Sequence, residues 1–384
     1  MLEDTGFFLI LSKRNKPDFL LVITALNHNS QITNQKYFPR LRHVFSNKNL
    51  KMKRTLIPFL ILSLIIVTAC NWHKDRLKID VSGIKTPGIK IGRYDQDLFR
   101  VSPDNLASDL KKLQGRYDFF LGTNLDDPSK LEQMKVYLEN PRTQDFHRAT
   151  ADKFKELSAV ENDLTDAFRH LEYYYPGIKQ PRFYSYISGG DYEHPVQLAD
   201  SVVIIALDTY LGRDFKPYFS DGVPQYRAER MNPDYIVPDV MKIMAGSLAP
   251  ENPNAMTLLD QIVEAGKTHY WLDAMMPDVP PHLKFGYTKA QADWITKNES
   301  HVWAAIIENS MLYSTDGKFS RMFLADGPNT TEFGAFSPPR MGEWIGWRIV
   351  RSYMENNSDV TLQQLLLEKD GQKILTLSGY KPEK

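Results

Sequence analysis

The chain has 384 residues, which is enough for one large domain or two of ordinary size. Its 47 basic and 47 acidic residues balance, and its single cysteine excludes a disulfide framework and any cysteine-rich zinc or iron–sulfur site. Its 21 glycines and 23 prolines are too few for a collagen or a low-complexity chain.

The charges are unevenly placed along the chain. Basic residues outnumber acidic ones in residues 1–51, whereas acidic residues outnumber basic ones in residues 71–384. A nucleic-acid-binding domain needs a clustered positive face, which a mildly acidic body does not favour. We therefore predict no nucleic-acid partner.

Residues 52–70 have the three parts of a secretory signal. Lys53 and Arg54 give a positive start, residues 56–67 are largely apolar, and residues 67–70 form a small-residue exit. The apolar stretch is shorter than the roughly 20 residues that cross a bilayer. These features indicate an export signal rather than a membrane-spanning helix.

The only cysteine stands at the exit of this signal. Bacterial lipoprotein signals end in this way, and the thiol takes a diacylglycerol and becomes the new N-terminus. We predict cleavage between Ala69 and Cys70 and lipid anchorage through Cys70. The alternative is a short membrane anchor in which the cysteine is incidental.

Two segments flank the signal. Residues 1–51 are interpreted as an upstream extension from a start codon placed too early, with Met52 as the initiator; the alternative is a real cytoplasmic leader. Residues 71–87 are polar and contain Gly83 and Pro87, which predicts a tether. Residues 88–384 remain for the globular domain.

The first half of the domain mixes strand and helix patterns. Residues 88–99 predict an edge strand, and Ser102 followed by Pro103 predicts the start of a helix. Residues 145–174 have helical apolar spacing and predict one long amphipathic helix. Two strands should follow at residues 181–187 and 201–207, the second of them buried on both faces.

The second half is predicted to be helical almost throughout. Capping-box spacing occurs at Thr288 with Gln291 and at Thr361 with Gln364. The expected helices are 235–248, 255–275, 288–298, 299–312, 342–356 and 361–368. The fold class is therefore α+β: a mainly helical single domain with a small sheet.

Motifs of known chemistry are missing from the chain. The nine histidines are spread too widely for an HExxH or HxxxH zinc pair, and no GxSxG elbow, phosphate-binding loop or GxGxxG turn occurs. We therefore predict no catalytic residue, no metal ligand and no cofactor, and we identify no small-molecule substrate.

Residues 344–354 are apolar on most faces, which predicts a buried helix. Arg348 and Arg351 lie within it, and an unpaired buried charge is costly. We expect both arginines to form structural ion pairs. The alternative is that they bind an anionic ligand.

Five segments carry a resemblance to a known family: residues 184–190, 201–212, 283–294, 311–316 and 345–357. In this order they resemble the GldB family of gliding-motility lipoproteins of the Bacteroidetes. The resemblance implies a lipid-anchored component of the cell envelope. It does not supply a molecular activity.

A more distant likeness is to predicted zinc peptidases of zincin type, which place an HExxH helix before a second helix with a glutamate ligand. Residues 258–267 are similar to the second helix, but Ala265 stands where the ligand is expected, and Glu264 is one position away. The segment 235–248 contains no histidine. The likeness therefore implies a degenerate zincin-like fold that has lost its metal.

Three functions follow from these observations. The leading hypothesis is a non-enzymatic, lipid-anchored component of gliding or secretion machinery, held in the outer membrane through Cys70, facing the periplasm and binding envelope proteins. The second is an envelope peptidase or hydrolase with a site gathered from scattered residues such as Asp208, Glu264, His269 and Arg348. The third is a peptide- or glycan-binding lipoprotein that uses the aromatic residues Tyr173, Tyr174, Tyr175, Tyr184 and Tyr186.

Overall fold

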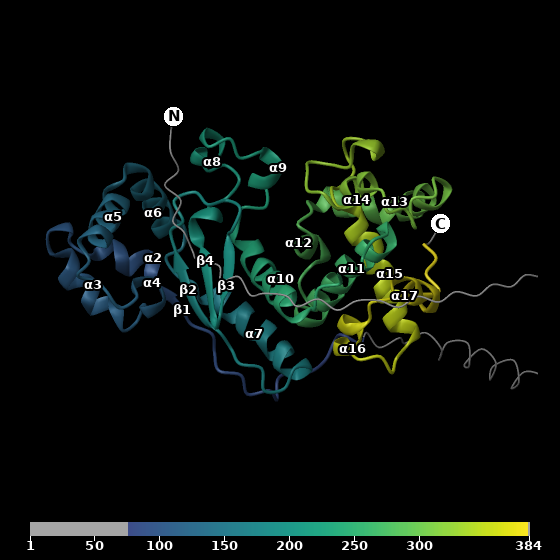
Figure 1. The fold of residues 1–384 in the computed structure, drawn as a ribbon, viewed down its shortest axis with the longest axis horizontal. Coiled ribbons are helices and arrows are strands. Elements are labelled where there is room, and N and C mark those ends of the chain that lie inside the picture. The colour runs from purple at the N-terminus through teal and green to yellow at the C-terminus, as the bar shows by residue number, and fades with distance from the viewer. Residues whose placement is uncertain (1–75, 383–384) are drawn as a thin grey trace, which may run out of the picture. The chain divides into compact units, whose positions relative to one another are not determined.

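The computed structural model describes residues 76–382, which fall within one compact unit of residues 73–384. The predicted extension, the signal peptide, Ala69 and Cys70 lie outside the described residues. The described chain is mainly helical and contains a four-stranded sheet, so the predicted α+β domain is confirmed (Figure 1).

The sheet is mixed and has the order β1-β2-β4-β3. Three of its strands are parallel, and β3 runs antiparallel to β4. In the register, Ile91 lies opposite Phe183, and Phe183 lies opposite Val203. The strands are β1 (Ile91–Arg93), β2 (Arg182–Tyr186), β3 (Val196–Ala199) and β4 (Val202–Ala206).

Helices cover both faces of this sheet, with α2–α6 on one side and α7 and α10 on the other (Figure 1). All five residues of β4 are buried, which confirms the prediction of a strand buried on both faces. Val203 joins the main core, whereas Val202 and Ile204 join a second core under the N-terminal helices.

Six α-helices lie between β1 and β2, and two of them begin at a residue whose side chain caps them. The side chains of Asp127 and Asn140 accept backbone N–H bonds at the starts of α5 and α6, and a proline follows each. These helices are α2 (Tyr94–Asp97), α3 (Leu106–Gln114), α4 (Asp118–Leu121), α5 (Pro128–Glu139), α6 (Pro141–Lys153) and α7 (Ser158–Tyr174).

The helices after β4 form the larger part of the domain. Both predicted capping boxes are present, at Thr288 with Gln291 and at Thr361 with Gln364. The helices are α8 (Lys216–Ser220), α9 (Gln225–Ala228), α10 (Ile236–Leu248), α11 (Leu258–Met275), α12 (Pro281–Phe285), α13 (Lys289–Glu308), α14 (Gly317–Leu324), α15 (Met341–Asn356), α16 (Leu362–Leu367) and α17 (Gly371–Ser378).

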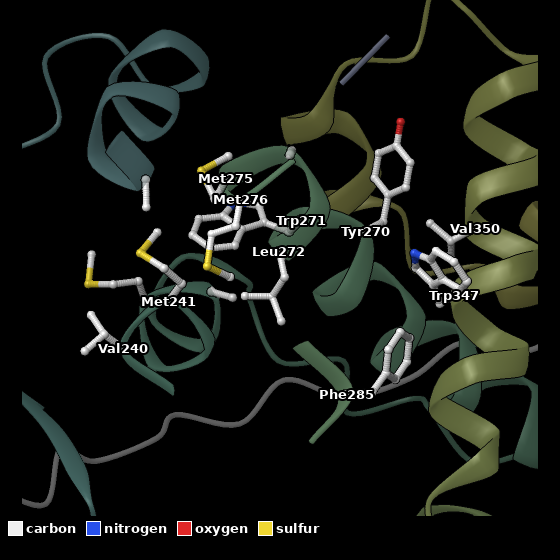
Figure 2. Packing of buried hydrophobic residues seen from close by; sticks show 14 of the residues in the cluster. Val240, Met241, Tyr270, Trp271, Leu272, Met275, Met276, Phe285, Trp347 and Val350 are labelled. Atoms are coloured by element: carbon white, nitrogen blue, oxygen red, sulfur yellow. The ribbon is translucent and has the colours of Figure 1, made fainter. Parts of the chain in front are cut away.

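Helix α11 is the centre of the main core, and its side chains face two neighbours. Trp271 and Met275 lie toward Met241 of α10, whereas Tyr270 lies toward Trp347 of α15 (Figure 2). Thirteen of the eighteen residues of α11 are buried, so most of the circumference of this helix lies in the core.

Two glycines let α11 and α15 touch through their backbones. A Cβ atom on Gly346 would lie 1.6 Å from the carbonyl oxygen of Ile262, and one on Gly266 would lie 2.2 Å from the carbonyl carbon of Gly346. No side chain fits at either position. The crossing of the two central helices therefore depends on glycine at both.

Two helix predictions are wrong. Residues 145–174 are two helices, α6 and α7, which are separated at residues 154–157. Phe146 packs in a small third core, whereas Phe154 and Leu157 turn into the main core. The predicted helices 288–298 and 299–312 are one continuous helix, α13, because Glu299 at the supposed break is buried.

The N-terminal predictions hold in part. β1 is an edge strand, but it contains only Ile91–Arg93 because α2 begins at Tyr94. The helix expected after Ser102 starts as one 3₁₀ turn at Pro103 and becomes α-helical at Leu106.

The described end of the predicted tether contacts the domain. Leu77 is buried in the main core. The guanidinium of Arg76 donates hydrogen bonds to the carbonyl oxygens of Met354 and Val360. These contacts place the start of the described chain beside the end of α15.

Candidate functional site

A pocket of about 230 Å³ stands out for the charges that line it. It lies among the loop before β3, the turn after β4, helices α9, α10 and α12, and the residue that precedes α15. Tyr192, Tyr210 and Tyr235 are also part of its lining. The charged lining residues are Glu193, Arg227, Arg230, Asp239, Lys242, Lys284, Asp326 and Arg340.

Helix α10 brings two charged side chains to this pocket. Asp239 and Lys242 are three residues apart and therefore share one face of a helix that is otherwise largely apolar. Tyr210 donates a hydrogen bond from its hydroxyl to Oδ2 of Asp239, at 2.8 Å. Burial raises the pKa of Asp239, so the protonated carboxyl persists to higher pH than is usual.

A histidine–glutamate pair lies behind the pocket wall. Nε2 of His269 is 2.9 Å from Oε2 of Glu343, and the imidazole stacks on Phe285 with ring centroids 3.8 Å apart. Burial lowers the pKa of His269, so the ring is neutral and Nε2–H donates to the carboxylate. Nδ1 is then an acceptor, and it has no hydrogen-bond partner among the described residues.

The carboxylate of Glu343 stays ionised although it is buried. Burial alone would raise its pKa, but the positive charges of Lys242 and Arg340 and the hydrogen bond from His269 hold the pKa well below the usual value. Nη1 of Arg340 lies 3.4 Å from Oε2 of Glu343. The ionised form is thus set by its neighbours rather than by solvent.

Arg340 is held in an unusual backbone position. Its φ of 52° is in the left-handed region, at the residue that precedes α15. Nη2 donates to the carbonyl oxygen of Phe285 at 2.8 Å, and Nε lies 3.3 Å from Asp326 without hydrogen-bond geometry. The strained backbone and these contacts fix the guanidinium at the pocket.

The other cations of the lining are paired with carboxylates. Arg227 pairs with Glu193 and Arg230 with Asp326, both at 2.6 Å. Lys284 pairs with Asp273 at 2.5 Å. Among the described residues, Lys242 is the lining cation that has neither an ion pair within 4.0 Å nor a hydrogen bond.

The scattered residues that the sequence offered for a hydrolase are not brought together. Asp208 is fully buried and accepts hydrogen bonds from the backbone N–H groups of residues 188 and 189 and from the Ser188 hydroxyl. Glu264 accepts from Lys267 and Asn252, and Arg348 pairs with Glu299. Each of these groups, like His269, has a separate structural partner.

Asp208 nevertheless shapes the pocket indirectly. Its hydrogen bonds hold the turn at residues 188–190, where Gly189 and Gly190 have positive φ angles of 71° and 104°. That turn leads into the loop before β3, whose residues Tyr192, Glu193 and Pro195 line the pocket. The carboxylate is a positioning group for this wall.

Arg348 and Arg351 of α15, for which the sequence predicts structural ion pairs, both form ion pairs. Nε of Arg348 lies 3.0 Å from Glu299, which also accepts hydrogen bonds from the Trp344 indole and the Tyr380 hydroxyl. Nε of Arg351 lies 3.0 Å from Glu355. Neither arginine lines the charged pocket.

The aromatic residues of the binding-protein hypothesis lie mostly in packed surroundings. The hydroxyl of Tyr184 donates to the carbonyl oxygen of Arg116 at 3.0 Å, and Tyr184 is buried in the second core. The hydroxyl of Tyr175 accepts a hydrogen bond from the Trp271 indole. Tyr173 is the exposed member of the set, at 48%.

The sequence reasoning missed the residues that line the charged pocket. A weak signal exists for two of them, because Asp239 and Lys242 interrupt an apolar helix at a spacing of three residues. No local pattern connects them to Lys284 or to Arg340, which reach the pocket from distant segments. The pocket is a product of the tertiary fold.

Comparison with known proteins places this fold in a family. Residues 74–382 match the family described as Gliding motility protein GldB. The chain belongs to the GldB family. This match confirms the resemblance carried by the sequence motifs, whereas the zincin likeness stays a prediction. No curated protein matches the chain, and no solved structure matches it.

Two further properties of this GldB-family chain concern residues 76–382. None of the helices in this range combines the length and the hydropathy that crossing a bilayer requires. The same range holds no group of three or more histidine, cysteine, aspartate or glutamate side chains arranged to bind a metal ion.

Proposed function

We propose that this GldB-family protein is a lipid-anchored protein of the cell envelope that serves gliding motility, or an associated secretion system, by binding partners rather than by catalysis. This proposal rests on the family match over residues 74–382, which begins four residues after Cys70, the predicted site of lipid attachment. The order of signal, Cys70 and family domain is that of an exported lipoprotein.

The contacts of the polar side chains support a binding role. Both carboxylate oxygens of Asp208 accept hydrogen bonds within the fold, and Glu264 is paired with Lys267, so each has a structural role. We infer that envelope proteins are the partners and that the protein is held in the outer membrane, facing the periplasm.

Lipidation at Cys70 would keep the domain close to the bilayer. Arg76 is bound to the domain and is six residues beyond Cys70. Six residues span at most about 20 Å, since a fully extended chain covers roughly 3.3–3.6 Å per residue. The proposal therefore implies a domain near the membrane surface, where it meets partners embedded in the same membrane.

The test is the substitution Cys70→Ser in the native host. We expect the variant to leave the membrane fraction and to lose labelling by radioactive palmitate, because several acyl chains provide the anchor. Gliding or secretion should fall in parallel. Asn71→Ser is the matched control, since it changes the neighbouring residue and keeps the thiol.

Membrane retention of unlabelled Cys70→Ser would contradict the lipid anchor. Full motility of a strain in which that variant is shown to be released would contradict the requirement for anchoring.

A further inference from the structure

One lysine that lines the charged pocket, Lys242, has no ion pair among the described residues. Arg227, Arg230, Lys284 and Arg340 each lie within 4.0 Å of a carboxylate. Lys242 has no such pair among the described residues, although its side chain is half-buried. A half-buried ammonium without a direct ion pair is costly, and a ligand anion in contact with it would reduce that cost.

The nearest carboxyl on the same helix does not neutralise Lys242. Asp239 is engaged by the Tyr210 hydroxyl at 2.8 Å, and its burial favours the protonated form. Glu343 is ionised, but it is bonded to His269 and lies beside Arg340. The charge of Lys242 helps to keep Glu343 ionised, but among the described residues no carboxylate oxygen lies within 4.0 Å of its ammonium group.

The pocket also contains donor groups suited to an oxyanion. The Nε–H of Arg340 is buried without a hydrogen bond in the described part of the chain, and the Arg340 side chain is 92% buried or more. Tyr192, Tyr210 and Tyr235 line the same pocket, but their hydroxyl groups already donate to Asp221, Asp239 and the carbonyl oxygen of Tyr287. Its volume of about 230 Å³ is below the roughly 300–1,000 Å³ of sites for larger ligands, so the bound group must be small.

We propose that this pocket binds a small ligand through one carboxylate or phosphate group, which forms an ion pair with the Lys242 ammonium. Ammonium–oxyanion contacts are among the stronger hydrogen bonds in proteins, because both partners are charged. The role is one of binding, and it is independent of the lipid anchor and of the family's part in motility.

The test uses the full-length lipoprotein in detergent and isothermal titration calorimetry. The probes are N-acetyl-alanine, the uncharged N-acetyl-alanine amide and inorganic phosphate, each up to about 10 mM, where even millimolar affinity is measurable. We expect heat from at least one of the two anions and none from the amide. Binding of the free acid identifies a carboxylate site, and binding of phosphate alone identifies a phosphate site.

Substitutions of Lys242 test whether this residue forms the contact with the anion. Lys242→Met should lower the affinity for the anion at least tenfold, since a charge-assisted hydrogen bond contributes roughly that factor or more to binding. Lys242→Arg should bind within about threefold of the parent because it keeps the charge. Lys297→Met removes an exposed lysine of α13 and should change nothing.

The thermal unfolding midpoint of each variant is measured first, so that loss of binding is not confused with loss of fold. Equal affinity for the acid and the amide would overturn the proposal. So would unchanged binding in a folded Lys242→Met protein, or no heat from any probe.

Discussion

His269 is neutral and Glu343 is ionised, although the two side chains are only 2.9 Å apart. The histidine is neutral because the cost of burying a charged imidazole exceeds the attraction of the carboxylate. The carboxylate is ionised because Lys242 and Arg340 add positive charge that the histidine does not supply. The charge of Glu343, and with it the buried hydrogen bond from His269, thus depends on Lys242 and Arg340.

This arrangement predicts a loss of stability in mild acid. The pKa of His269 in the folded state is below its value in the unfolded chain, which is about 6.5. In the interval between these values the unfolded state binds the proton and the folded state does not, so the free energy of unfolding falls as the pH drops below about 6.5. The slope contributed by one such group is at most about 1.4 kcal/mol per pH unit.

Denaturant unfolding between pH 7.5 and 5 measures this slope, above the range in which Glu343 titrates. His269→Gln keeps an N–H donor for Glu343 and removes the titrating group, so its slope should be smaller than that of the parent. His147 and His282 also have lowered pKa values and leave a residual slope. The exposed His301→Gln is the control. A slope that is the same in the parent and in His269→Gln would contradict the assignment.

At the scale of single residues, the sequence indicates that a buried charge must be paired, but it does not indicate which residue pairs with it. The apolar helix 344–354 required that Arg348 be paired or reach solvent, and the structure shows an ion pair with Glu299. Glu299 itself belongs to α13, where its place among Lys297, Asn298 and Ser300 suggests a solvated helix end. Which charges meet is decided by how the helices cross.

At the scale of elements, the contact between α11 and α15 determines the centre of the molecule. Gly266 and Gly346 face each other with backbone atoms in contact distance, so the helices approach more closely than side chains would allow. The close contact of the two helices therefore determines how the buried side chains beside it pack, Tyr270 and Trp347 among them (Figure 2).

The substitution Gly346→Ala should destabilise the protein by at least about 3 kcal/mol, because the new methyl group overlaps the carbonyl oxygen of Ile262 and the helices must separate. Gly246→Ala is the matched control. Gly246 lies in α10 with open space around its Cβ position, so alanine should stabilise by roughly 0.5–1 kcal/mol.

Chemical denaturation of the two variants gives both values. Gly346→Ala with parent stability, or with a gain like that expected of Gly246→Ala, would contradict the close contact of the two helices.

The elements that could be predicted from sequence are those whose signal is local. The capping boxes at Thr288 and Thr361 and the apolar run of β4 were recognised because neighbouring residues define them. The break between α6 and α7 was missed because helical spacing continues across it, while Phe146 and Phe154 pack in different cores. Helix α5 and strand β3 are not among the predicted elements, although Leu131, Met134 and Leu138 have helical spacing in α5 and Val196 and Leu198 alternate in the four residues of β3.

At the scale of the whole described domain, the sheet divides a large core from a small one. The main core contains α11 and α15, whereas the second core lies under α3–α5 and the opposite face of the sheet (Figure 1). Stability is rarely uniform in such a structure, because local opening depends on how much buried surface holds each element.

Hydrogen exchange should therefore be slower in α11 than in α5. Thirteen of eighteen residues are buried in α11, but only Leu138 is buried among the twelve residues of α5. We expect mass-resolved exchange at neutral pH to label α5 first, while α11 exchanges only with global unfolding. Equal protection of the two helices would show that both cores open as one unit.

The order of the strands has a consequence for how the chain folds. Strands β2, β3 and β4 lie within residues 182–206 and can pair as soon as that segment is made, but Ile91 of β1 must wait for Phe183. Long-range pairing of this kind is slow, since the intervening loop must close before the contact contributes. Among the described strands, β1 comes first in the chain but is expected to pair last, and until then its unpaired backbone can pair with other chains.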